Sequence, residues 1–179
     1  YEATNILEPV SAVAEEGDIS EIICSSDGVE RFSAADSFDL AEKEIIELTF
    51  NNSSGNKKGL VLSTRQTLLS TFLFYQTLAY MGSAAVDWLA KLEQNQQLRK
   101  TLKFTEEGFG LIEVFYHNKE GNWERSSETG ETGPIAGDVK IIPIDYLPSD
   151  GEIKVKLKLT KGLWRIDFAA IADIIDEVN

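Results

Sequence analysis

The stretch that decides the fold is EIKVKLKL, at residues 152–159. Apolar and polar residues alternate through it without interruption, and a period of two is the pattern of a strand with one buried face. Its other face would carry Lys154, Lys156 and Lys158, a row of charges that discourages pairing with a foreign strand. The stretch therefore predicts one strand of a sheet that packs against a core.

Similar runs recur on both sides of this stretch. Polar turn sequences separate them, such as residues 118–122, where Gly121 can take the left-handed turn position. We expect strands at residues 21–24, 29–32, 45–50, 59–63, 102–104, 111–117, 123–126, 139–144 and 163–169. About nine short strands, with one connection long enough for a crossover helix, predict a mainly β fold. The fold class is an antiparallel β-sandwich, jelly-roll-like in type.

One segment, around residues 67–94, breaks the strand pattern. Thr67 can cap a helix over 68–81, in which ten of fourteen residues are apolar or aromatic and cover nearly every side. Gly82 should interrupt this helix, and Ser83 can cap an amphipathic second one over 84–94. A helix that is apolar all round needs cover on all sides. It either threads through the core or contacts another domain, a subunit or a membrane interface.

The length of 179 residues suits a single β-sandwich domain, residues 1–179. We interpret residues 1–19 as an extended or poorly ordered lead-in. The segment 67–94 is then a helical insertion. The tail 171–179 has apolar residues at helical spacing and is expected to form a short terminal helix.

The charge of the chain excludes several partners. Lys and Arg number 17 and Asp and Glu number 30, a net charge of −13, which disfavours nucleic acid and anionic membranes. No stretch reaches the ~20 apolar residues of a transmembrane segment. The first fifty residues hold thirteen of the acids. They are either solvated or include a structural calcium site built on Asp18, Asp36 or Asp39, and we expect no other cofactor.

Catalytic signatures are missing from the sequence. His117 is the single histidine and Cys24 the single cysteine, which excludes a conventional zinc site or a disulfide within one chain. No serine lies in a nucleophile elbow. We therefore expect no catalytic residue and no metal ligand set. The remaining enzyme hypothesis requires a deep pocket with paired carboxylates of displaced pKa.

A sugar site is a second possibility. An exposed aromatic ring stacks on the apolar face of a pyranose, and Trp123 and Tyr116 are the candidate rings. Glu131 and Asp138 would contribute polar groups from the glycine-rich loop 129–138. Trp164 is in phase with apolar neighbours and is expected in the core.

The runs at residues 152–157 and 162–169 resemble the closing strands of galactose-binding-like β-sandwich domains. This resemblance implies an accessory module of a larger secreted or surface protein, in an extracellular, periplasmic or surface-anchored location. The single cysteine leaves the compartment open.

Two functional hypotheses follow. The first is a non-catalytic interaction module that docks onto another domain or subunit through the apolar helical segment. Its interface residues would be Phe72, Phe74, Tyr75, Tyr80 and Met81. The alternative is a carbohydrate-binding module of a secreted or surface protein.

Overall fold

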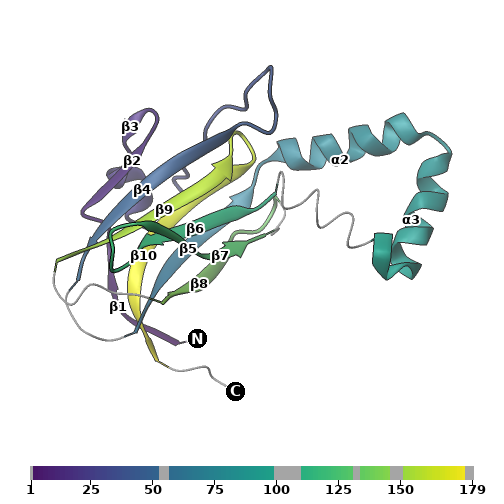
Figure 1. Cartoon of the computed structure of the whole chain (residues 1–179). Helices are drawn as coiled ribbons and strands as arrows, with labels where there is room; N and C mark the ends of the chain where they lie inside the picture. The colour runs from purple at the N-terminus through teal and green to yellow at the C-terminus, as the bar shows by residue number, and fades with distance from the viewer. Residues whose placement is uncertain (1, 53–56, 99–109, 131–133, 146–150, 176–179) are drawn as a thin grey trace.

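The computed structural model describes residues 2–52, 57–98, 110–130, 134–145 and 151–175, and within them two antiparallel sheets lie face to face (Figure 1). The four-stranded sheet has the order β1 (Glu2–Leu7), β10 (Trp164–Ile175), β5 (Lys58–Gln66) and β8 (Asp138–Ile144). The six-stranded sheet has the order β3 (Gly17–Asp18), β2 (Ser11–Ala14), β4 (Lys43–Asn51), β9 (Glu152–Thr160), β6 (Ile112–His117) and β7 (Trp123–Thr129).

The strand order is that of a jelly roll. When the β2–β3 hairpin is set aside, β1 and β4 to β10 count as strands one to eight. The two sheets then run 1-8-3-6 and 2-7-4-5. The predicted antiparallel sandwich is confirmed, with β2 and β3 added at one edge.

The core lies between the two sheets. β9 alternates as predicted: Ile153, Val155, Leu157 and Leu159 are buried and the lysines between them point outward. The opposite sheet contributes Trp164, 1% exposed, which confirms its predicted place in the core. Burial of each large apolar side chain stabilises the fold by roughly 1.5–3 kcal/mol.

The prediction of a lead-in over residues 1–19 was wrong in part, because residues 2–18 contain three short strands. β1 pairs with β10 and β2 pairs with β4, both antiparallel. These strands are short, and most of β1 is exposed. The partner of β1 lies far along the chain, and β2 and β3 are too short to show a strand pattern in the sequence.

Residues 21–24 were predicted as a strand but belong to α1 (Ser20–Ile23) and the residue after it. An Asp18 carboxylate oxygen accepts hydrogen bonds from the Ser20 amide, at 2.9 Å, and from its hydroxyl, at 2.6 Å. This local bond starts a helical turn that buries Ile19 and Ile23, four residues apart. The strand predicted at 29–32 is reduced to one bridge between Arg31 and Ile166.

The helix predicted from residue 171 was also wrong, because β10 continues to Ile175. β10 lies between β1 and β5 and is buried on both faces, with Ile171 in the main core and Ala170 and Ala172 against Val61 on the other side. A strand buried on both faces has a nearly continuous apolar sequence, which helical spacing also fits. The strand expected at 102–104 lies outside the described residues.

Candidate functional site

The helical insertion forms an arm that projects from the sandwich (Figure 1). It begins directly after β5, at Thr67. The Thr67 hydroxyl accepts a hydrogen bond from the Leu69 amide at 3.3 Å and donates one to the Gly162 carbonyl at 2.6 Å. The Thr67 amide donates to the Leu163 carbonyl at 2.9 Å. The predicted cap is confirmed, and the same residue fixes the base of the arm to the turn between β9 and β10.

The first helix of the arm, α2 (Leu68–Met81), has no buried residue. Leu69 and Leu73 are one turn apart and pack against the edge of the core. Tyr80 continues their stripe seven residues later, in the part of α2 that projects away from the sandwich, and is 89% exposed. The apolar surface of α2 is therefore covered only near its base.

The predicted interface residues lie on this uncovered surface. Phe72 and Tyr75, 55% and 65% exposed, follow Leu68 on a second stripe, and Phe74 lies on a third. Met81 is partly exposed at the end of the helix. The alternative that the segment threads through the core is thus wrong. None of the described helices is long and apolar enough to cross a membrane.

Gly82 ends α2, as predicted, with a φ of 55° that favours glycine. The arm then turns into α3 (Ala84–Gln94), an amphipathic helix whose Trp88 and Leu89 are partly exposed. Ser83 makes no side-chain cap hydrogen bond, contrary to the prediction. Its φ and ψ are already helical, so its hydroxyl is not placed to cap.

The predicted sugar-site residues do not form one site. Tyr116 is buried on the inner face of β6, whereas Trp123 pairs with the next residue, His117, on the outer face. Asp138 belongs to β8, in the other sheet. Glu131 lies outside the described residues. The period of two along β6 separates Tyr116 from Trp123, because adjacent residues of a strand face opposite sides.

Trp123 instead belongs to a surface that we call the aromatic–lysine face. It consists of outward side chains of β9, β6 and β7: Lys154, Lys156, Phe115, His117 and Trp123. The rings of His117 and Trp123 lie 4.1 Å apart between centroids, tilted by 56°. The Lys156 ammonium lies over two rings, 4.4 Å from the Trp123 centroid and 5.2 Å from that of Phe115.

The lysines of β9 differ in their partners. Lys158 faces Glu113, with their charged atoms 3.6 Å apart, and Arg125 also pairs with Glu113. Lys156 lies opposite Glu47 of β4 in the ladder but turns toward the rings. Among the described residues, neither Lys154 nor Lys156 forms an ion pair.

A cavity of about 220 Å³ adjoins the aromatic–lysine face at the β6–β7 turn. It is lined by Tyr116, His117, Asn118, Lys119, Gly121, Glu152, Ile153 and Lys154. Gly121 has a φ of 77°, as the turn prediction requires. Burial raises the pKa of the Tyr116 phenol, and the nearby Glu124 carboxylate adds to this effect. The phenol therefore stays neutral.

The carboxylates considered for calcium are engaged in turns. Asp36 accepts hydrogen bonds from the Phe38 and Asp39 amides, at 2.7 and 2.8 Å, and these bonds hold its pKa below the usual range. Asp18 is bound to Ser20. Across the described ranges, no group of three or more potential ligand side chains gathers. These carboxylates cap backbone turns.

A second group of carboxylates surrounds a buried arginine. Arg31 donates to both oxygens of Glu16, at 2.8 and 2.9 Å, and to Glu44 at 2.6 Å. Both carboxylates line a surface cavity of about 540 Å³. The hydrogen bond from Arg31 lowers the pKa of Glu16. A general acid needs a raised pKa, so Glu16 does not fit that role.

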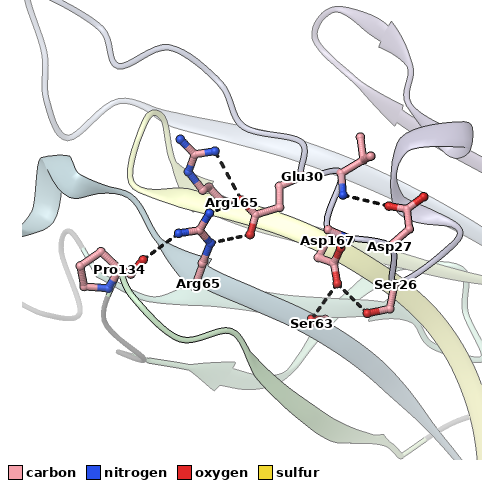
Figure 2. A network of polar contacts seen from close by, with 10 residues as sticks. Ser26, Asp27, Glu30, Ser63, Arg65, Pro134, Arg165 and Asp167 are labelled. Atoms are coloured by element: carbon pink, nitrogen blue, oxygen red, sulfur yellow. Dashed lines mark hydrogen bonds and ion pairs between the residues drawn. The ribbon is translucent and has the colours of Figure 1, made fainter.

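Figure 2 shows a polar network on the outer face of the four-stranded sheet. Arg65 of β5 donates to both carboxylate oxygens of Glu30, and Arg165 of β10 lies 3.4 Å from the same carboxylate. Asp167 accepts from the Ser26 hydroxyl, at 2.7 Å, and from the Gly28 amide, at 2.9 Å. The network fastens residues 26–30 across β5 and β10.

No protein-family model matches the sequence, and no curated protein is significantly similar to it. Among solved structures, a mutant family 29 carbohydrate-binding module in complex with mannohexaose has a TM-score of 0.38 and 8% identity, over 96% of this chain and 92% of that one. A second mutant of such a module has a TM-score of 0.34 and 9% identity, over 76% and 77%. At this low similarity no ligand can be inferred for this chain. The jelly-roll assignment rests on the strand order.

Proposed function

We propose that this chain is a non-catalytic interaction module that docks through its helical arm, and that the surface it docks onto is the arm of a second copy. The observation that carries the proposal is the absence of any buried residue in α2, a helix built from apolar and aromatic side chains. Exposed apolar patches of this kind mark interaction surfaces.

The arm exposes a large aromatic area that a partner could cover. Phe72, Phe74, Tyr75 and Tyr80 are each about half exposed or more. An aromatic side chain presents ~150–250 Å², so these four leave roughly 500 Å² in water on each chain. A second arm would cover part of this area, because the four rings lie on three stripes around the helix and a helix–helix contact buries one face of each partner.

The charge distribution favours a second arm as the partner. α2 contains no charged residue, although the whole chain carries −13. Its fourteen residues span ~21 Å, about twice the distance over which physiological salt screens charge. Contact between arms therefore lets the acidic bodies stay apart. An anionic membrane would instead bring the acidic body close to negative lipid.

Light scattering coupled to size exclusion, at several protein concentrations, tests the proposal. We expect twice the mass of one chain for the native protein and a single-chain mass for Phe72→Asp combined with Tyr80→Asp. The matched control is Phe38→Asp, because Phe38 is fully exposed on the body rather than on the arm. A native protein that stays a monomer throughout would contradict the proposal.

The aromatic–lysine face supports a second candidate function, the binding of carbohydrate. The observation in its favour is the partly exposed Trp123 ring beside His117, on a sheet surface next to a polar cavity. Aromatic rings on such a surface stack on pyranose rings, and the polar groups around them bind hydroxyls. A glycan array is the test, with Trp123→Ala as the variant that should lose the signal. No binding by the native chain would refute it.

A further inference from the structure

Two lysines of the aromatic–lysine face have no ion-pair partner in the part of the chain that the structure describes, although the chain is strongly acidic. Lys154 and Lys156 form no ion pair among the described residues, although Glu47 lies directly across the ladder from Lys156. Lys158, two residues further along, does face a carboxylate. Lys156 lies over the rings and Lys154 lines the cavity, together with His117 and the carboxylate of Glu152.

The position of Lys156 constrains what can bind. Its ammonium covers the Trp123 ring at 4.4 Å, so a sugar that stacks there must displace it. A neutral sugar would remove the cation–π contact and offer the ammonium only hydroxyl groups in return. A sugar with a carboxylate would replace that contact with a charge-assisted hydrogen bond, which is stronger. Displacement of Lys156 therefore favours an anionic ligand.

We infer that the ligand of this face is an acidic oligosaccharide, in which a pyranose ring stacks on Trp123 and a carboxylate binds Lys154 and Lys156. This inference rests on the second candidate function, carbohydrate binding, and specifies its ligand class. The cavity beside His117 would receive the adjoining sugar unit, because Lys154 lines both surfaces.

The test is calorimetric titration of the full chain with oligogalacturonate and with the same oligosaccharide reduced to its neutral form. We expect the acidic form to bind about tenfold or more tightly, because hydrogen bonds to charged groups are the stronger ones. Lys154→Gln combined with Lys156→Gln should remove this difference. Lys158→Gln is the matched control and should retain it, because Lys158 already faces Glu113.

The outcomes separate the inference from the function on which it rests. Equal binding of both oligosaccharides, lost in Trp123→Ala, would overturn the acidic ligand and leave carbohydrate binding intact. No binding of either form would overturn both. Binding of inorganic pyrophosphate as tightly as oligogalacturonate, unaffected by Trp123→Ala, would show a simple anion surface and overturn the stacking arrangement.

Discussion

The interior of the sandwich contains a charged pair whose removal should have a large and specific effect. The Lys58 side chain is fully buried at the start of β5, and its ammonium donates to Asp173 of β10 at 2.6 Å. The Asn5 amide of β1 donates to the other oxygen of Asp173 at 2.8 Å. Three strands of the four-stranded sheet thus meet at one carboxylate.

The substitution Lys58→Met keeps the apolar stem of the side chain and removes its charge. The Asp173 carboxylate then stays buried without its cation, and such losses cost ~3–5 kcal/mol of unfolding free energy. Because Asn5 still donates to it, we expect a value near the lower end, ~3 kcal/mol. Asp173→Leu should cost a similar amount, because it leaves the Lys58 ammonium buried.

The double variant, Lys58→Met with Asp173→Leu, provides the sharper measurement. Replacing a buried pair by apolar groups is often nearly neutral, so the double variant should lose less stability than either single one. Urea unfolding, monitored by circular dichroism, gives the unfolding free energies of the native chain and the three variants that this double-mutant cycle requires. Lys91→Met, at an exposed position of α3, is the control. Additive losses, or single losses below ~1 kcal/mol, would refute the reasoning.

Three further predictions follow from contacts near the arm and the polar network. Gly162→Ala should lower the unfolding free energy, measured by urea unfolding, by roughly 1–3 kcal/mol from backbone strain alone. Gly162 has a φ of 76°, and a new Cβ would also lie 2.6 Å from Ala35. Thr67→Val should cost ~1–2 kcal/mol and speed amide exchange in the first turn of α2, because the cap is lost. The hydrogen bond from Arg65 lowers the pKa of Glu30 in the folded protein, so the ionised Glu30 stabilises the fold until the pH falls below the ordinary value of 4.5. In Glu30→Gln, acid unfolding should show a shallower decrease of the unfolding free energy over this pH range.

The sequence predicted the parts of the fold whose patterns are local. The alternation in β9 identified both its buried face and its lysine row, and Thr67 and Gly82 identified the ends of α2. β1 and the end of β10 were missed, because each pairs with a strand more than a hundred residues away. β2 and β3 were missed because they are short. A short apolar run such as 171–175 fits a helix and a doubly buried strand equally well.

The candidate sites show the same division. The apolar helix could be predicted from its sequence, but its exposure could not, because a helix that is apolar on every side also fits a path through the core. The contact of Trp123 with Lys156 could not be predicted, because Lys156 reaches the ring through the pairing of β9 with β6 and not through sequence spacing. The pairing of Lys58 with Asp173 was likewise missed, since charged residues are rarely buried and no local signal marks an exception.

The central claim, that α2 is covered by a second arm, is tested most directly by hydrogen–deuterium exchange of α2 at low and high protein concentration. We predict that the amides of Leu68–Met81 exchange rapidly in dilute protein, where no residue of the helix is buried, and slow strongly as concentration rises. In Phe72→Asp with Tyr80→Asp, the exchange should stay rapid at every concentration. Exchange of native α2 that is independent of concentration would contradict the account.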